Sequence, residues 1–527
     1  MKKLFSYSVI IKIIFFFVFV GGIIQIFSFP VGLNKFDGYD FLEGVLLSEA
    51  SLKSGTIVSP TFYYYYLLPF GPSLYFVPFV YLIGPSLLSN QLGMLLFYFI
   101  YLFILYYLAN SIFIETNNRY LFMSITSLFI FTYIGDNILH HILCYGIGLL
   151  CFFGELGSCI NYIKNKKTKY IIFLFIFAIY ASLNGLSVMA FSTIPIIISL
   201  IAMWLCKIDN KIFDNKKRIF SIICLIVFVS IIGLIINKQV SSAATLCLGR
   251  DINRFYLAHT DDICNNIINN LLTNVVKIFC YDRYGAFFVS FASIDFFVSF
   301  LFMICSIVLF YFSIKKINIK KNISFFIFAS NIVVIFISIF MFIFSDHSNE
   351  RYLFNGFISV YIMIALYIVM NIELINKRYL YIIGLCIFVF ILLIKQCGEF
   401  YYNNNKKIYY DSLKDILIDS KCKFGFANQS NAVPLHLLSN GELEFGYIDT
   451  DNQYDNGKLS LVKETNFYDN YVLENLSENI FVIMNMNNYR NLVKSNLNNI
   501  DIIKTINYFD EVILIVNKYN IEKLLIN

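Results

Sequence analysis

Long apolar runs alternate with short polar connections over the first four hundred residues of the chain. A helix rises about 1.5 Å per residue and the hydrocarbon core of a bilayer is about 30 Å thick, so about 20 apolar residues form one crossing. Two of the runs are short by this measure. The predicted spans are residues 5–29, 91–113, 120–135, 140–161, 170–185, 187–206, 219–236, 287–313, 323–344, 353–371 and 379–395. The pattern predicts a mainly α fold, a polytopic transmembrane helical bundle of about 11 spans.

Residues 62–84 are also apolar enough to cross, but their composition favours a different role. Pro69, Gly71, Pro72 and Pro78 interrupt the segment, and proline in a helix interior removes a backbone hydrogen bond. We therefore assign residues 30–89 to one long outer loop, part of which lies at the membrane surface. The alternative is an additional span here, compensated by a miscounted one elsewhere.

Basic residues in the connections predict the orientation of the bundle. The clusters are Lys164–Lys169, Lys207–Arg218, Lys315–Lys321 and Lys377–Arg378. With eleven spans, all four clusters and the N-terminal lysines fall on the cytoplasmic side, as the positive-inside rule expects. The first apolar run is then expected to be a retained signal anchor. A second long outer loop covers residues 237–286, and the chain after about residue 397 lies outside.

The tail differs in composition from the rest of the chain. It is rich in asparagine and mixes helical with alternating periodicity. The strings KFGFA, FVIMN, IIKTINYF and EVILIV predict strands, and PLHLLSNGELEFGYI predicts a helix, a turn and a strand. We therefore divide the chain into a transmembrane domain, residues 1–396, and a small extracytoplasmic α/β domain, residues 397–527.

Composition narrows the class of protein. Of 527 residues, 58% are hydrophobic and only 14% are charged, and the mean hydropathy is +0.70. Soluble proteins carry about 25% charged residues, so a soluble enzyme is excluded. The net charge is +6, and the basic residues of the membrane part lie in short loops between apolar segments, which argues against nucleic-acid binding. Cys247, Cys264 and Cys280 share one predicted loop, where a disulfide and free thiols both remain open.

The polar residues that do not act as topology signals fall on the predicted outer side. The first outer loop contains FDGYDFLEG, in which Asp37, Asp40 and Glu43 follow one another at intervals of three. On a helix these side chains lie roughly along one face. A carboxylate at the membrane surface can accept a proton from an acceptor hydroxyl. The simpler interpretation is that outer loops contain acids because they are solvated.

The string YIGDNILHH forms a second candidate, with Asp136, His140 and His141. Asp136 and His140 share a helical face at i, i+4. With a first-loop carboxylate they could bind a divalent ion or orient a substrate phosphate. Asp136 also suits a helix cap, and the two roles are compatible. The sequence does not decide whether a metal ion takes part.

A third candidate is SDHSNERY, which separates two spans and contains Glu350 and Arg351. A guanidinium at the mouth of a cavity suits bidentate phosphate recognition, and the alternative is an ordinary Glu–Arg surface pair. Three arginines of loop 237–286 are further candidates for binding an anion: Arg250, Arg254 and Arg283. Glu155 is an acid inside a span, and snorkelling or a helix–helix hydrogen bond would explain it.

The order of these features resembles the GT-C superfamily of integral-membrane glycosyltransferases, which includes protein O-mannosyltransferase-like and aminoarabinose-transferase-like enzymes. The acidic motif FDGYDFLEG follows the first span. The later stretch LLPFGPSLYFVPFVYLIGPS resembles the proline-containing segment of the family. Asp136 in the next outer loop, Glu-Arg-Tyr before a late span and a terminal α/β domain complete the resemblance. Gly38 stands where a second acid is usual, so both Asp37 and Asp40 remain candidates for the catalytic carboxylate.

The resemblance implies transfer of a sugar from a polyprenyl-phosphate donor to a lipid, glycan or protein acceptor outside the cytoplasmic membrane. Asp37 or Asp40 would be the general base, Asp136 and His140 would shape the substrate site, and Glu350 with Arg351 would hold the lipid phosphate. Glu43 and His141 would add to substrate binding. The alternatives are a polymerase or ligase of the O-antigen type, which would use the loop arginines, and a transporter of lipid-linked glycan.

Overall fold

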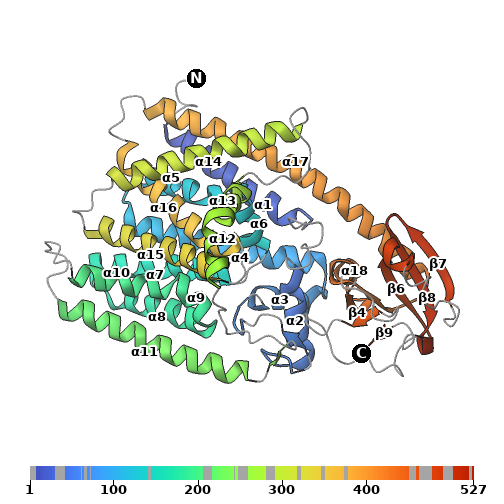
Figure 1. The fold of residues 1–527 in the computed structure, drawn as a ribbon. Helices are drawn as coiled ribbons and strands as arrows, with labels where there is room; N and C mark the ends of the chain where they lie inside the picture. The colour runs from blue at the N-terminus through green and yellow to red at the C-terminus, as the bar shows by residue number, and fades with distance from the viewer. Residues whose placement is uncertain are drawn as a thin grey trace. The chain divides into compact units, whose positions relative to one another are not determined.

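The computed structural model describes most of the chain. The described residues are 7–29, 42–60, 62–64, 68–71, 73–140, 144–205, 216–242, 244–246, 259–279, 291–316, 322–345, 350–372, 378–449, 459–461, 478–490, 502–520 and 525–526. They form a helical part and a terminal sheet (Figure 1). The predicted fold class is therefore confirmed.

Eight of the described helices are long and apolar enough to cross a membrane. They are α1 (Tyr7–Phe27), α4 (Leu87–Ile112), α7 (Cys144–Asn165), α11 (Lys216–Ser241), α14 (Phe291–Lys316), α15 (Asn322–Phe344), α16 (Phe354–Asn371) and α17 (Arg378–Asp419). Each coincides with a predicted span. Helices are favoured here because a helix satisfies its own backbone hydrogen bonds where no water is present.

The three remaining predicted spans are also helical, but shorter or broken. Residues 120–135 fall on α5 (Thr116–Thr126) and the 3-10 helix η2 (Ser127–Phe131), and residues 170–185 on α8 (Thr168–Leu183). Residues 187–206 are divided at Ser192 into α9 (Leu186–Phe191) and α10 (Thr193–Leu205). The count of eleven crossings therefore stays a prediction.

The first predicted outer loop contains two short helices that pack together, α2 (Glu43–Ser54) and α3 (Ser73–Ile83). With 11 residues, α3 is about 16 Å long, roughly half the thickness of the hydrocarbon core. Its length supports the prediction that residues 62–84 do not cross. Two two-residue strands, β1 (Tyr63–Tyr64) and β2 (Thr245–Leu246), pair in parallel and join this loop to the second one.

The tail forms a mixed sheet of seven described strands in the order β7-β8-β6-β3-β4-β5-β9. Their bounds are β3 (Phe424–Ala427), β4 (Glu444–Asp449), β5 (Leu459–Leu461), β6 (Asn479–Asn485), β7 (Ile502–Tyr508), β8 (Glu511–Asn517) and β9 (Leu525–Ile526). Strand β3 lies between β4 and β6 and runs parallel to both. Helix α18 (Gln429–Leu438) connects β3 to β4 and packs on them.

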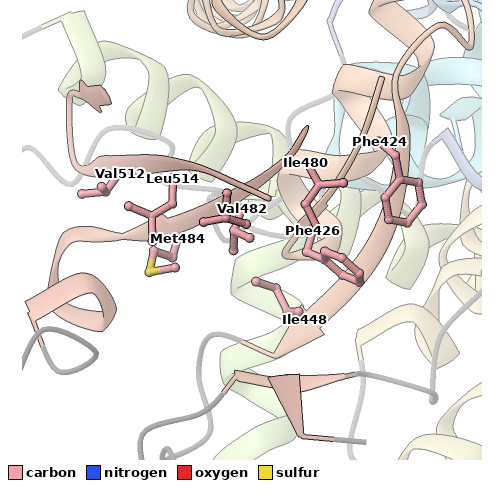
Figure 2. Packing of buried hydrophobic residues seen from close by; sticks show 9 residues of the cluster. Phe424, Phe426, Ile448, Ile480, Val482, Met484, Val512 and Leu514 are labelled. Carbon is pink, nitrogen blue, oxygen red and sulfur yellow. The ribbon is translucent and has the colours of Figure 1, made fainter. Parts of the chain in front are cut away.

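Alternating apolar side chains of neighbouring strands form the core of this sheet (Figure 2). Phe426 of β3, Val482 of β6 and Leu514 of β8 are fully buried. The predicted strands KFGFA, FVIMN, IIKTINYF and EVILIV all coincide with strands of the sheet. Strands β3, β6 and β8 are buried at successive positions, so their short apolar runs, which remove both faces from water, identified them.

The contacts divide the chain into two compact units. One unit contains residues 1–27, 95–239 and 254–400, which include most of the apolar helices. The other contains residues 28–94, 240–253 and 401–527. The helices α2 and α3 thus belong to the same unit as the terminal sheet.

Phe76 of α3 provides a test of the packing within the second unit. Its ring lies against two glycines, Gly44 of α2 and Gly93 of α4, and a Cβ at either position would overlap the ring. We expect Gly44→Ala and Gly93→Ala each to destabilise the protein by about 1–3 kcal/mol, because overpacking forces the ring to move. The apparent unfolding midpoint in detergent measures this effect.

The matched control is Gly398→Ala, in the exposed part of α17, where no atom lies within 4 Å of the added carbon. That change should leave stability unchanged or raise it by about 0.5–1 kcal/mol. Equal effects at all three positions would contradict the close packing of Phe76.

Candidate functional site

Only one of the three first-loop acids falls within the described part of the chain. Asp37 and Asp40 lie outside the described residues, and Glu43 is the first residue of α2. The side chain of Glu43 is buried. A carboxylate in the first turn of a helix is favoured by the partial positive charge of the helix N-terminus.

The second candidate group lies on a short helix, α6 (Tyr133–His140). This helix contains Asp136 and His140 one turn apart, as the i, i+4 spacing predicts, and their side chains are not among those described. His141 lies outside the described residues. Helix α6 packs against α1, α7 and η2.

The third group begins a long helix. Glu350 and Arg351 lie in the 3-10 helix η4 (Glu350–Leu353), directly before α16, and Arg351 is half-buried. The side chain of Glu350 is not described. Helix α13 (Leu271–Phe279), from the second predicted outer loop, contacts both α6 and η4. Segments about 130 and 70 residues from α13 in the sequence therefore have one neighbour in common.

Asn266 fixes the second predicted outer loop, residues 237–286, to the end of α15. The loop helices α12 (Thr260–Asn265), the π-helical η3 (Asn266–Asn270) and α13 follow one another without interruption. The buried amide of Asn266 donates to the carbonyl oxygens of Ile343 at 3.0 Å and Ser345 at 3.1 Å, at the end of α15. It thereby satisfies two terminal carbonyls that the helix leaves unpaired.

Asn355, one turn after Arg351, is a residue that sequence reasoning missed. Its side chain is only 3% exposed, yet neither the oxygen nor the nitrogen of its amide has a hydrogen-bond partner within the described chain. The nitrogen lies 3.8 Å from the point where a Cβ at Gly148 of α7 would stand. Burying an amide without partners costs about 1–3 kcal/mol. The signal was an asparagine at the start of an apolar run, since polar side chains within spans mark functional positions.

Glu155, an acid inside a predicted span, is bonded to a neighbouring helix. It is fully buried in α7, and Thr193 of α10 donates a hydrogen bond to its Oε1 at 2.7 Å. Of the two explanations offered by the sequence, the helix–helix hydrogen bond is the one observed.

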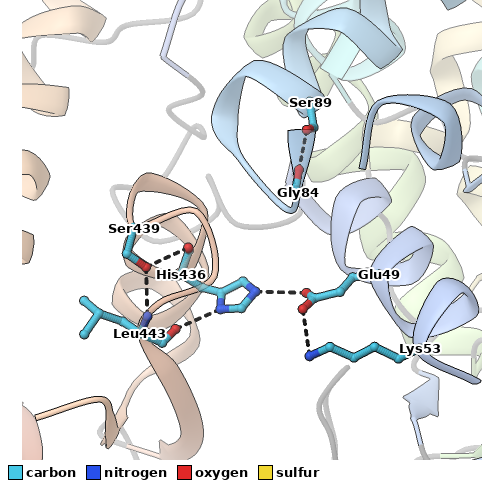
Figure 3. Close-up of polar contacts among 7 residues, drawn as sticks. All are labelled: Glu49, Lys53, Gly84, Ser89, His436, Ser439 and Leu443. Atoms are coloured by element: carbon cyan, nitrogen blue, oxygen red, sulfur yellow. Dashed lines mark hydrogen bonds and ion pairs between the residues drawn. The ribbon is translucent and has the colours of Figure 1, made fainter. Parts of the chain in front are cut away.

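A further charged group, which sequence reasoning did not single out, joins α2 to the tail (Figure 3). His436 of α18 places Nε2 2.9 Å from Oε2 of Glu49, and Lys53 places Nζ 2.8 Å from Oε1 of the same carboxylate. The other ring nitrogen, Nδ1, donates to the carbonyl oxygen of Leu443 at 2.8 Å. We call Glu49, Lys53 and His436 the α2 clamp. Sequence reasoning did not connect Glu49 with His436, because nothing local links positions 387 residues apart.

The surroundings of the imidazole determine its charge. A carbonyl oxygen accepts hydrogen bonds only, so Nδ1 carries a proton, and Nε2 then faces a carboxylate that also accepts. The ammonium of Lys53 favours the ionised carboxylate, so the ring is an imidazolium. Burial alone would lower the pKa of His436, but the hydrogen bond and charge of Glu49 outweigh burial and raise this pKa above its ordinary 6.5.

The same balance acts in the opposite direction on Glu49. Burial alone would raise its pKa, but the hydrogen bond and charge of His436, with the charge of Lys53, lower the pKa below its ordinary 4.5. Both members of the pair are therefore stabilised in their charged forms.

Among the described residues, no three His, Cys, Asp or Glu side chains are grouped so that they could hold a metal ion. The predicted ligands Asp136 and His140 do not have described side chains, so the metal question stays open. Arg250, Arg254 and Arg283, on which the polymerase alternative depends, lie outside the described residues.

Comparison with solved structures identifies the fold. No protein-family model matches the sequence, and no curated protein matches it. The apo crystal structure of ArnT from Cupriavidus metallidurans matches over 97% of both chains, with a TM-score of 0.57 and 10% sequence identity. The chain has the GT-C fold of ArnT. The resemblance expected from the sequence is thereby confirmed at the level of the fold.

The same neighbour has also been solved with a lipid. ArnT from C. metallidurans bound to undecaprenyl phosphate matches 97% of this chain and 98% of its own, with a TM-score of 0.54 and 10% identity. Together with the eight apolar helices, the shared GT-C fold makes this chain a multi-pass membrane protein.

The charges of the α2 clamp predict how stability depends on pH. His436, with its raised pKa, contributes stability that is fully present below pH 6.5 and is lost as the pH rises through the folded-state value. Glu49 contributes stability that is present above pH 4.5 and is lost as the pH falls through its lowered value. We expect His436→Gln to destabilise the protein most between these limits, by about 1.5–3 kcal/mol.

The measurement is the unfolding midpoint of both proteins between pH 5 and pH 9. The difference between them should shrink at the alkaline end, where the wild-type ring is neutral. Glu442→Gln, an exposed change close to the same turn, should have no such dependence. A constant difference across the range would show that the ring acts by packing and not by charge.

Proposed function

We propose that this protein transfers a sugar from a polyprenyl-phosphate-linked donor to an acceptor on the outer side of the cytoplasmic membrane. The observation that carries the proposal is the match of fold over nearly the whole chain to ArnT, one structure of which holds undecaprenyl phosphate. A shared fold does not by itself establish an activity. The arrangement of polar groups in the predicted outer segments supplies the second line of support.

In the proposed reaction, Asp37 or Asp40 accepts the proton of the acceptor hydroxyl. The hydroxyl oxygen forms a bond to the anomeric carbon of the donor sugar, and the bond from that carbon to the phosphate oxygen breaks. The electron pair leaves with the polyprenyl phosphate. A positioned carboxylate base typically contributes 10²–10⁴-fold to such a step.

The donor phosphate would be held where α6, α13 and η4 come together. The contact of α13 with both other segments supports this location, because two predicted phosphate-binding groups then have a common neighbour. Arg351 would pair with the phosphate oxygens, assisted by Glu350, and Asp136, His140 and His141 would shape the site. Glu43, at the start of α2, would add to acceptor binding.

Asn355 would contribute a hydrogen bond to the donor within the same site. Its amide offers two donors and an acceptor, which suits sugar hydroxyls and phosphate oxygens alike. The cost of burying an unpaired polar side chain is offset when a bound ligand supplies its hydrogen-bond partner. The tail would help to bind the acceptor.

The acids of the first loop provide the direct test. We expect Asp37→Asn or Asp40→Asn to lower the rate of undecaprenyl phosphate release from an undecaprenyl-phosphate-linked sugar by about 10²–10⁴-fold. The protein is assayed in nanodiscs, and the released lipid is quantified by mass spectrometry. Asp415→Asn, an exposed change on α17, is the control. Full activity in both first-loop variants would exclude the proposed base.

Asn355→Leu separates a binding role from a structural one. Leucine is close to asparagine in shape and removes the unpartnered amide, so we expect the unfolding midpoint without ligand to stay the same or rise. We also expect undecaprenyl phosphate to stabilise the variant less than the wild type, because a ligand at concentration c that binds only the folded protein adds RT ln(1 + c/Kd) of stability, which shrinks as Kd rises.

Two results would contradict the role of Asn355. A large loss of stability without ligand would show that the amide supports the fold. Unchanged stabilisation of the variant by undecaprenyl phosphate would show that the Asn355 side chain does not contact the lipid headgroup. Ser330→Ala, whose hydroxyl donates to Phe326 within α15, serves as a control for a polar change inside a span.

A further inference from the structure

A tight turn of the tail contacts the short helices of the first loop. The turn follows α18 and comprises Ser439–Leu443, with Asn440 at φ 52° and Gly441 at φ 82°. Ser439 fixes the turn, since its hydroxyl donates to the carbonyl of His436 at 2.9 Å and accepts from the amide of Leu443 at 3.0 Å. The carbonyl of Leu443 in turn orients the His436 ring. The turn and the ring therefore form one rigid group.

This group meets the first loop at two places. A Cβ at Gly441 would stand only 2.9 Å from Cγ of Pro85, which follows α3, so the turn and Pro85 are in close contact. Ser89 of α4 donates to the carbonyl of Gly84 at 2.5 Å and holds the bend that contains Pro85 (Figure 3). The second place is the α2 clamp, where His436 binds Glu49.

Helix α2 is held from both sides. On one side Ser48 donates to the carbonyl of Ser73 at 3.1 Å, and Phe76 of α3 packs against Gly44. On the other side the only charged contact described between α2 and the tail is that of Glu49 with His436. Since α2 begins at Glu43, three residues after Asp40, a displacement of α2 moves the anchor of the acidic loop.

We propose that His436 is a positioning residue, through which the tail holds α2, the helix that follows the acidic motif of Asp37 and Asp40 in the sequence. The proposal deepens the proposed function and rests on it for the role of the two acids. Protonation of the ring closes the clamp, and loss of that proton leaves two acceptors, Nε2 and the Glu49 carboxylate, facing each other. Sugar transfer should therefore decline at alkaline pH as α2 is released from the tail.

The charged groups that act on the ring come from one helix. Glu49 attracts the imidazolium and Lys53 opposes it, and both lie on α2. The tail contributes the uncharged carbonyl of Leu443. The response to pH is thus a property of the contact between α2 and α18, and it can be removed by neutralising either partner.

The experiment compares the full-length wild type with His436→Gln, Glu49→Gln and the double variant in nanodiscs between pH 5.5 and pH 8.5. The first readout is release of undecaprenyl phosphate from an undecaprenyl-phosphate-linked sugar. We expect kcat of each single variant at pH 6 to fall about ten- to a hundredfold, because small misplacements of a catalytic group have effects of this size. KM for the donor should stay within about twofold.

The double variant should lose no more activity than either single variant, since coupled partners are not additive. The decline of wild-type kcat at alkaline pH should be absent in His436→Gln. His259→Gln, a change at an exposed histidine of the other unit, should retain the wild-type rate and pH profile.

The second readout is amide hydrogen exchange in residues 43–54, corrected for the intrinsic effect of pH, which reports local opening without any turnover. In the wild type this exchange should accelerate above the pH at which the clamp opens, and in His436→Gln it should be fast throughout. The wild-type measurement tests the clamp even where the variants fail to fold.

The outcomes distinguish the two proposals. If amide exchange in residues 43–54 depends on pH but the protein does not turn over the donor, the α2 clamp is supported and the proposed function is contradicted. Turnover with a wild-type pH profile in His436→Gln would overturn the positioning role and leave the transferase standing. Exchange in residues 43–54 that is indifferent to pH in the wild type would also overturn the positioning role.

Discussion

The absence of water in the hydrocarbon core is the constraint from which the rest of this structure follows. Backbone groups there must bond within their own segment, so the apolar runs become helices. Some polar side chains inside these helices bond to a neighbouring helix, as Thr193 does to Glu155, and others bond to a carbonyl of their own helix, as Ser330 does. Charge and irregular backbone are left to the connections. The candidate chemistry is therefore concentrated at helix ends and in short helices such as α6 and η4.

These connections are ordered elements that the bundle positions. Asn266 bonds to the carbonyls at the end of α15, and α13 then reaches both α6 and η4. Asn355 lies one turn after Arg351 of η4, and its buried amide is left unpaired in the described chain.

Besides forming a sheet, the tail contacts helix α2 and the bend at Pro85. Its apolar strand faces form a core of their own, so the domain can present a rigid turn to another part of the second unit. The turn at Ser439–Leu443 contributes Gly441 to this contact, and His436 of the preceding helix contributes the charged side chain. The contact to α2 combines a buried ion pair, which is sensitive to the loss of either partner, with close packing against Pro85. Protonation of His436 is thus the step that we propose to couple the tail to α2, the helix that follows the acidic motif in the sequence.

The sequence by itself determined the class and most of the elements. Apolar length predicted the eight long helices, and short runs of apolar residues predicted the tail strands, because both depend on which side chains must leave water within one segment. The order of the motifs, through its resemblance to a known superfamily, predicted the fold. Only the tertiary structure showed that the buried amide of Asn355 has no hydrogen-bond partner among the described residues. It also decided which segments meet: α13 beside α6 and η4, and His436 on Glu49. Such contacts join residues tens to hundreds of positions apart, and no local pattern encodes them.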